Sequence, residues 1–263
     1  MNSEADFKFN LIYPSLEKES FEWSAPSNIA LVKYWGKKTN QIPANPSISF
    51  TLHSCKTITK LGVFKKDTQD TFSFDLLFEG KPKEDFKPKI QKFLERVEVY
   101  LPFLKDYHFT IDTQNTFPHS SGIASSASGM AALAMNIMSL EKALNPSMSE
   151  DYFYQKASFL ARLGSGSACR SVKGEVVIWG RHSVTENQSS RLENIYQNIH
   201  AYYGDLLDEH SLYEIVDKVQ PDEIYNLAAM SHVRVSFDVP SFTIKTNSLG
   251  VLNMLETYRK IVP

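Results

Sequence analysis

The pattern of apolar and polar positions predicts a strand and two helices in the middle of the chain. Residues 107–113 alternate apolar and polar side chains, which is typical of a half-buried strand. Residues 130–144 are rich in alanine, leucine and methionine and end at an Asn-Pro pair, so they predict a helix. Residues 150–163 predict a second helix, with Ser149 as its N-cap and Gly164 at its end.

The character of the sequence changes near residue 180. Residues 174–180 predict a strand, and a polar stretch typical of a linker follows it. The pattern then predicts a strand at 201–203, a helix at 209–219 and a strand at 223–228. Such an alternation is typical of βαβ units. We therefore predict two domains, residues 1–180 and residues 181–263.

Composition excludes several classes of protein. Of the 263 residues, 42% are hydrophobic and 22% charged, which suits a sizeable core and excludes wholesale disorder. The net charge of −2 argues against a dedicated nucleic-acid binder. The longest apolar run, residues 130–135, is far shorter than a membrane span of roughly 18–20 residues. With no signal-peptide pattern and only Cys55 and Cys169 as cysteines, a cytoplasmic setting is expected.

Residues 117–129 form a stretch rich in serine and glycine between the predicted strand and helix. Small residues let a ligand approach the backbone, and the free N–H groups at a helix start attract phosphate. The stretch is not a Walker A loop, because G-x-x-x-x-G-K-[ST] is absent. We interpret it as an anion site, with a loop that only permits tight packing as the alternative.

Two further segments suit an anionic ligand. Residues 164–171 place Arg170 in a turn of serines and glycines, where a guanidinium offers paired donors to carboxylate or phosphate. Residues 25–38 bring three lysines beside a tyrosine and a tryptophan. A solvated turn and a plain amphipathic strand are the respective alternatives. Cys169 is more typical of a buried structural thiol than of a nucleophile. Together the three segments favour a phosphorylated small molecule, and no histidine or cysteine stands at metal-ligand spacing.

In their order and spacing, the three segments resemble mevalonate diphosphate decarboxylases of the GHMP kinase superfamily. The resemblance covers residues 1–180 and rests on Asn28-Ile29-Ala30, on residues 33–37 and on the two small-residue segments. It implies an α+β fold of the GHMP type, a mixed sheet with helices on one face. It also implies an ATP- and Mg²⁺-dependent reaction. The tertiary hydroxyl of mevalonate diphosphate is phosphorylated, and loss of phosphate and carbon dioxide then gives isopentenyl diphosphate.

The resemblance also implies roles for individual residues. Lys33 and Arg170 are the implied catalytic residues, Lys33 adding positive charge near the reacting groups and Arg170 clamping the substrate carboxylate. The residues implied to bind the substrate are Tyr34, Trp35, Gly36, Lys37, Ser165, Gly166, Ser167, Ala168, Cys169 and Arg170. Those implied to cradle the ATP phosphates are Pro118, Ser120, Ser121, Gly122, Ala124, Ser125 and Ser126. No residue is assigned to a metal ion.

One functional part of the family pattern is missing. The family carries its catalytic aspartate in an Asp-Ala-Gly-type motif in the C-terminal half, whereas no aspartate in this sequence is followed by alanine. The carboxylate that would act on the tertiary hydroxyl therefore has no candidate. We expect a decarboxylase-like site that is catalytically incomplete.

Residues 181–263 resemble a different family, the GDP-mannose 4,6-dehydratases, which are extended short-chain dehydrogenases with a Rossmann sheet and NADP. The segments that carry this resemblance are residues 203–206, 220–229 and 231–240. The glycine-rich turn of these enzymes is absent, and no Tyr-x-x-x-Lys pair follows the matching segments. The tail is therefore expected to be an incomplete α/β Rossmann-like fragment that does not bind NADP.

Three hypotheses for function follow: an active decarboxylase, a binding protein that retains the ligand sites without turnover, and a non-functional fusion of two fragments. The expected partner is a phosphorylated small molecule, with neither nucleic acid nor membrane. A homodimer is an arrangement that the resemblance allows, since relatives of residues 1–180 are commonly homodimeric. Because an incomplete parallel sheet leaves edges and apolar faces open, we predict marginal stability or aggregation.

Overall fold

The chain forms two compact units, Met1–Tyr196 and Gln197–Pro263, here called unit 1 and unit 2. The computed structural model describes residues 4–9, 15–67, 71–118, 123–180, 189–191, 202–226, 228–230 and 233–261. Each unit is described by itself. The boundary near residue 180 predicted from the sequence stays a prediction.

Within these described ranges, unit 1 is built around a mixed sheet of seven strands. The strands are β1 (Lys18–Val32), β2 (Ser47–Lys65), β3 (Ser73–Phe78), β4 (Lys81–Pro82), β5 (Tyr107–Asn115), β6 (Val176–Trp179) and β7 (Ser189–Arg191). Their order is β4-β3-β5-β2-β6-β7, with β1 also paired to β2. The long β2 pairs antiparallel with β1, β5 and β6, whereas β3 and β5 run parallel. This confirms the mixed α+β sheet expected from the resemblance.

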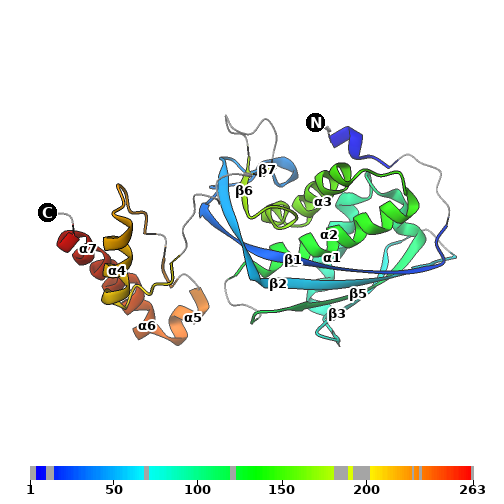
Figure 1. The fold of residues 1–263 in the computed structure, drawn as a ribbon. Helices are drawn as coiled ribbons and strands as arrows, with labels where there is room; N and C mark the ends of the chain where they lie inside the picture. Colours follow the sequence, from blue (N-terminus) through cyan, green and yellow to red (C-terminus); the bar gives the residue numbers. More distant parts are fainter. Residues whose placement is uncertain are drawn as a thin grey trace. The chain divides into compact units, whose positions relative to one another are not determined.

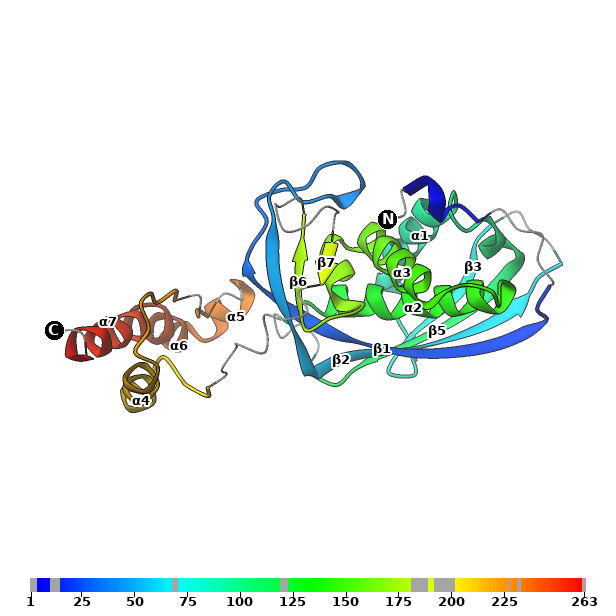
Figure 2. The ribbon, with the colours of Figure 1, turned by 45° about the horizontal axis from the view of Figure 1, so that its top comes forward.

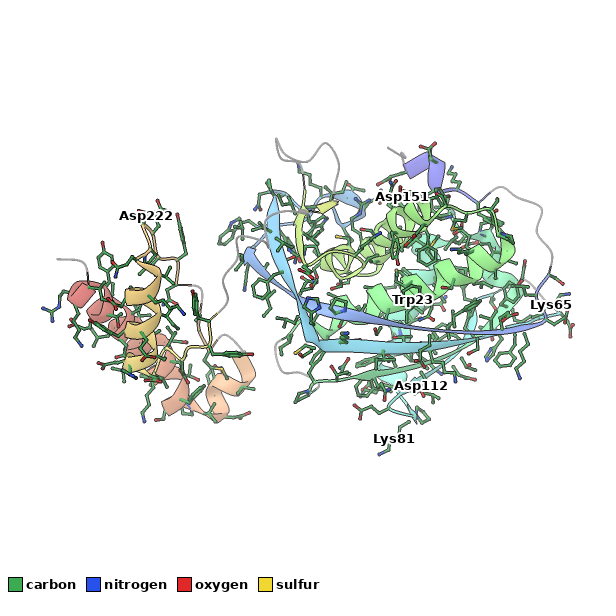
Figure 3. All side chains as sticks on the ribbon, in the orientation of Figure 1. Trp23, Lys65, Lys81, Asp112, Asp151 and Asp222 are labelled. Carbon is green, nitrogen blue, oxygen red and sulfur yellow. The ribbon has the colours of Figure 1, made fainter. Side chains whose placement is uncertain are left out.

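Three helices cover one face of this sheet: α1 (Lys87–Val97), α2 (Ser125–Leu144) and α3 (Glu150–Gly164) (Figures 1 and 2). Alternation along β5 buries Tyr107, Phe109 and Ile111, while Asp112 lies on the face away from the helices (Figure 3). Trp23 of β1 points toward the helices, and its Nε1 donates to Ser139 Oγ of α2 at 2.7 Å. Among the described residues, no helix has the length and apolarity to cross a membrane.

Short 3₁₀ helices complete unit 1. They are η1 (Glu4–Phe7), η2 (Thr39–Gln41), η3 (Glu84–Phe86), η4 (Pro102–Asp106) and η5 (Gly166–Ser171). The last of them follows α3 directly and leads into β6. It therefore places the Arg170 segment beside the end of the sheet formed by β2 and β6.

The helix boundaries follow local signals in α3 and tertiary contacts in α2. Ser149 caps α3 as predicted, its Oγ accepting from the N–H of Tyr152 at 3.2 Å. Helix α2 begins at Ser125, earlier than the predicted residue 130. The reason is that Ser128 is satisfied inside the fold: its Oγ lies 2.6 Å from Thr57 Oγ1 and donates to the Ser125 carbonyl at 3.1 Å. A serine disfavours a helix interior because its hydroxyl can form hydrogen bonds to nearby backbone groups in non-helical conformations. Here the hydroxyl of Ser128 is already satisfied within the fold.

Helices α2 and α3 are joined by a buried ion pair. Lys156 Nζ donates to Glu141 Oε1 at 2.7 Å, and both side chains are almost completely excluded from solvent. Desolvation raises the pKa of Glu141 and lowers that of Lys156, because each charged form is disfavoured by burial. The pair fixes how the two helices face each other, since neither charge has another ion-pair partner in the described part of unit 1.

Unit 2 is helical in its described residues. Its elements are α4 (Glu209–Val219), α5 (Val233–Asp238), α6 (Pro240–Ile244), a π-helical segment (Lys245–Leu249) and α7 (Gly250–Ile261). Helix α4 has the bounds predicted from the sequence, with Asp208 accepting from two backbone N–H groups as its N-cap. Leu206, Leu212 and Val216 are buried, and α4 packs on α7.

The strands predicted for the tail at 201–203 and 223–228 are wrong for the residues that the structure describes there. Residues 202–203, 223–226 and 228 have no strand conformation. A strand is stabilised by hydrogen bonds to a neighbouring strand, and the described part of unit 2 contains none. The two segments whose pattern is typical of a strand therefore have no neighbouring strand to pair with among the described residues of unit 2.

Candidate functional site

The side chain of Asn45 crosses the loop between β1 and β2, which backbone hydrogen bonds also hold together. Asn45 Oδ1 accepts from the backbone N–H of Trp35 at 2.7 Å, and Asn45 Nδ2 donates to the carbonyls of Lys33 at 3.1 Å and Pro46 at 2.9 Å. The side chain of Trp35 is 89% exposed, and that of Lys33 is exposed as well. The loop backbone is therefore ordered, while these two side chains lie open to solvent.

Arg170 of η5 is a buried cation. Its side chain is 3% exposed, and its Nη1 donates to Ser47 Oγ of β2 at 2.6 Å. Its Nε is buried without a hydrogen-bond partner, and no carboxylate of the described residues pairs with it. Burial lowers the pKa of the Arg170 guanidinium. A buried arginine in this state is suited to an anionic ligand.

Aromatic rings join Arg170 to the loop after β1. The Arg170 guanidinium lies 5.4 Å from the ring of Trp179 on β6, and Trp179 packs edge-to-face with Tyr34 at 4.8 Å. Lys37 Nζ lies 5.7 Å from the Tyr34 ring. A methyl group built on Gly166 would lie 3.2 Å from Lys37 Cε. Two of the predicted segments, residues 33–37 and η5, therefore meet at one place, with two cations on the same aromatic pair.

Two neighbouring residues of β1 tie the predicted segments to the sheet. Asn28 Nδ2 donates to Ser171 Oγ at 2.7 Å and to the Ser167 carbonyl at 3.3 Å. Ser27 Oγ donates to the Ile123 carbonyl at 3.2 Å, just before α2. Asn28, the first residue of the Asn28-Ile29-Ala30 segment, therefore anchors η5 to the sheet. Ser27, directly before it, anchors the loop that leads into α2.

Only part of the predicted phosphate loop lies within the described residues. Ser120, Ser121 and Gly122, together with the neighbouring His119, lie outside them. Pro118 is exposed, and Ala124 directly precedes α2. Ser125 and Ser126 form the first turn of α2 and line a pocket of about 200 Å³ between that turn, α1 and strands β2, β3 and β5.

Lys89 of α1 lines the same pocket, and the sequence analysis did not single it out. Lys89 is exposed as a whole residue, but partial desolvation lowers the pKa of its ammonium, and the charge of Lys37 lowers it further. An anion bound in this pocket would therefore favour the charged form of Lys89. A signal was present in the sequence, since Lys89 stands four residues before the buried Phe93 and thus on the same side of the helix.

The remaining members of η5 are mostly structural. Ala168 and Cys169 are buried, Gly166 packs on Trp179, and Ser167 is half-buried, as is Ser165 directly before η5. Burial raises the pKa of the Cys169 thiol to about 12, which excludes a thiolate at neutral pH. No group of three histidine, cysteine, aspartate or glutamate side chains suitable for a metal ion occurs in the described ranges.

Comparison with known proteins gives two family matches. Residues 25–191 match the diphosphomevalonate decarboxylase-like N-terminal domain, and residues 171–262 match the GDP-mannose 4,6 dehydratase family. Diphosphomevalonate decarboxylase of Debaryomyces hansenii is 36% identical over 178 residues, covering 64% of this chain and 44% of the relative. That of Saccharomyces cerevisiae is 37% identical over 170 residues, covering 59% and 40%. The chain spans less than half the length of these curated relatives.

Solved structures agree with this match. Mevalonate diphosphate decarboxylase from Staphylococcus aureus has a TM-score of 0.55 at 25% identity, covering 93% of this chain and 70% of that one. MDDEF in complex with MVAPP, AMPPCP and magnesium has a TM-score of 0.55 at 26% identity, covering 94% and 77%. Because the first family model covers more than half of the sequence, the chain belongs to the diphosphomevalonate decarboxylase-like N-terminal domain family.

Proposed function

We propose that unit 1 binds mevalonate diphosphate and Mg²⁺-ATP in the manner of the first half of a diphosphomevalonate decarboxylase. The observation that carries this proposal is Arg170, a buried cation with no carboxylate partner in the described part of the chain. A buried charge that is left unpaired is unfavourable in the free protein. A ligand that carries a carboxylate would supply the missing partner.

At the substrate end, the charges of the site match those of the ligand. Mevalonate diphosphate has a carboxylate at one end and a diphosphate at the other. In the proposed arrangement Arg170 clamps the carboxylate, while Lys37 and the backbone of residues 33–37 hold the diphosphate, with Lys33 adding positive charge near the reacting groups. Support comes from the contact of residues 33–37 with η5 through Tyr34 and Trp179.

At the nucleotide end, the pocket beside α2 suits a nucleoside with its phosphates at the helix start. Its walls are mainly apolar, with Leu76, Phe78 and Ile90 among them, and Ser125 and Ser126 stand at the N-terminus of a long helix. Lys89 adds a cation to the same pocket. Since no acidic side chain among the described residues lines the pocket, Mg²⁺ would be held chiefly by the phosphates of the nucleotide.

When bound, ATP supplies the phosphoryl group that the reaction places on the tertiary hydroxyl. The residues of unit 1 bind and orient the two ligands and provide positive charge, which are the main protein contributions to phosphoryl transfer. The base for the hydroxyl proton has no candidate, because the family's aspartate motif is absent from this sequence. We therefore propose binding without turnover by this sequence alone.

Thermal unfolding with and without ligands tests the proposal. A ligand that binds only the native state raises the transition temperature of unit 1, whether or not turnover follows. Mevalonate diphosphate with Mg²⁺-ATP should raise it, and the release of ADP and carbon dioxide should stay at background. A rise without turnover supports binding alone, turnover contradicts the incomplete site, and no shift contradicts the binding site itself.

A second candidate rests on the dehydratase match over residues 171–262. By that match the tail would contact NADP, yet the glycine-rich turn that holds the dinucleotide phosphates is absent from this sequence. NADP with GDP-mannose therefore serves as the comparison in the same experiment. We expect no shift with this pair, and a shift would favour the second candidate.

A further inference from the structure

We propose that Trp179 of β6 is a positioning residue that holds Arg170 in a ligand-ready state and thereby sets the preference for a substrate that carries a carboxylate. The inference rests on the proposed function and assigns a role to a residue outside the predicted site. Trp179 is fully buried, contacts η5 and the loop after β1, and pairs with Ser47 of β2.

The sheet register places two contacts to Arg170 on one pair of residues. Trp179 of β6 is directly opposite Ser47 of β2 in the antiparallel pairing. Opposite residues of an antiparallel pair project to the same face. Ser47 Oγ accepts from Arg170 Nη1 at 2.6 Å, and the Trp179 ring lies 5.4 Å from the Arg170 guanidinium carbon. The hydroxyl of Ser47 and the indole of Trp179, both at the end of the sheet, therefore hold the Arg170 guanidinium in place.

An indole suits this task better than a carboxylate. A ring attracts a cation through its quadrupole, carries no net charge and leaves the positive charge of the arginine uncompensated. An aspartate or glutamate at the same place would form an ion pair and compete with an anionic ligand. Trp179 therefore stabilises a buried arginine while keeping it available for a carboxylate.

The other sides of the indole contact the segments assigned to the substrate. Its ring packs edge-to-face with Tyr34 at 4.8 Å and an angle of 78°. A methyl group on Gly166 would lie 2.8 Å from Trp179 Cη2, which is closer than real contacts allow. Position 166 must therefore be glycine for the ring to lie where it does. A shift of the indole would move Arg170, Tyr34 and η5 together.

The test measures a preference rather than an affinity alone. Calorimetry gives the Kd of mevalonate diphosphate and that of isopentenyl diphosphate, which lacks both the carboxylate and the tertiary hydroxyl. For Trp179→Leu we expect the first Kd to rise roughly five- to thirty-fold, as loss of a desolvated cation–π contact implies, and the second to change less than about two-fold. Trp179→Phe keeps a ring face and should retain most of the preference. Gly166→Ala, which crowds the ring, should lower the preference as well.

Coupling to Arg170 is tested by a double variant. If Trp179 acts through Arg170, Trp179→Leu should cause no further loss of preference in an Arg170→Gln background. Trp23→Phe is the matched control, because Trp23 donates to Ser139 at a distance from the site along β1. It should leave both dissociation constants unchanged while lowering the transition temperature slightly.

The outcomes separate this inference from the function on which it rests. Failure of the unaltered protein to bind mevalonate diphosphate overturns the proposed function. Binding with a carboxylate preference that folded Trp179→Leu retains overturns the role of Trp179 alone. If the dissociation constants of both ligands rise equally, Trp179 has a merely structural role, and this inference is overturned as well. If Trp179→Leu fails to fold, the carboxylate preference is measured in Trp179→Phe and Gly166→Ala instead. Both of these variants keep a buried aromatic ring at position 179.

Discussion

Arg170 carries a positive charge and is buried, and burial disfavours a charged group because it removes the water that hydrates it. Its hydrogen bond to Ser47 and its contact with Trp179 compensate only part of the lost hydration. Proteins tolerate such a group where it serves a ligand. The residue type and its serine- and glycine-rich surroundings were visible in the sequence, but its burial and its lack of a carboxylate partner among the described residues were not.

The first prediction concerns the stability of the free protein. Arg170→Met removes a buried charge and keeps an apolar side chain in place of the arginine stem, so we expect unit 1 to gain about 1–2 kcal/mol. Chemical denaturation without ligand measures the gain. The same variant should lose the shift caused by mevalonate diphosphate. A stability loss larger than that of Ser47→Ala would contradict the view that Arg170 is unfavourable in the free state.

The second prediction concerns thiol reactivity and pH. Since burial raises the pKa of Cys169 to about 12 from 9.0, its thiol stays protonated at pH 8 in the native protein. A thiol reagent such as Ellman's should then label only Cys55, which is half-buried, and label both cysteines after denaturation. The folded state holds the Cys169 proton more tightly than the unfolded chain. Its contribution to stability is therefore complete below pH 9 and falls as the pH rises toward 12.

At the scale of elements, helix α2 shows how tertiary contacts override local propensity. Its first turn is rich in serines, which favour loops in isolated peptides. The pairing of Ser128 with Thr57 on β2 satisfies a hydroxyl that would otherwise compete with the helix. For α3, by contrast, the cap at Ser149 and the terminal Gly164 suffice, and both ends could be predicted from local signals.

The third prediction concerns the ion pair between α2 and α3. Glu141→Gln leaves Lys156 buried without a counter-charge, so we expect a loss of about 3–5 kcal/mol in the free energy of unfolding. The double variant Glu141→Met with Lys156→Met should recover most of it, because two apolar side chains need no partner. Urea unfolding of the three proteins measures both effects. Equal losses in the single and double variants would show that the charges are not coupled.

At the scale of the whole molecule, the two units differ in how much apolar surface they bury. Unit 1 has a large core between its sheet and helices. In unit 2 the buried apolar side chains among the described residues are Leu206, Leu212 and Val216, while Phe237 is 80% exposed. Further apolar residues on its helices are exposed: Phe242, Ile244, Leu249, Leu252 and Leu255. Small cores give marginal units, so unit 2 is expected to unfold first.

The fourth prediction separates the two units. Leu212→Asp places a charge in the small core of unit 2, so hydrogen exchange there should become fast. Exchange in unit 1, and its thermal shift with mevalonate diphosphate and Mg²⁺-ATP, should not change. Binding of a hydrophobic dye to the unaltered protein at moderate temperature tests the exposed apolar surface of unit 2. One reversible, cooperative transition for the whole chain would contradict the expected independence.

Some features were determined by the sequence because they depend on short-range physics. The caps of α3 and α4, the alternation of β5 and the small-residue segments with their order along the chain belong to this group. Local hydrogen bonds and side-chain size act within a few residues, so they can be predicted without the fold. The family resemblance rests on the same local segments.

Other features were decided only by the tertiary structure. The contact of Tyr34 with Trp179, the register that sets Trp179 opposite Ser47, and the burial of Arg170 all depend on residues far apart in the sequence. The strands predicted for the tail failed for the same reason, because a strand depends on a partner that its own sequence does not contain. Charge, burial and pairing are properties of neighbours in space, and no periodicity along the chain encodes them.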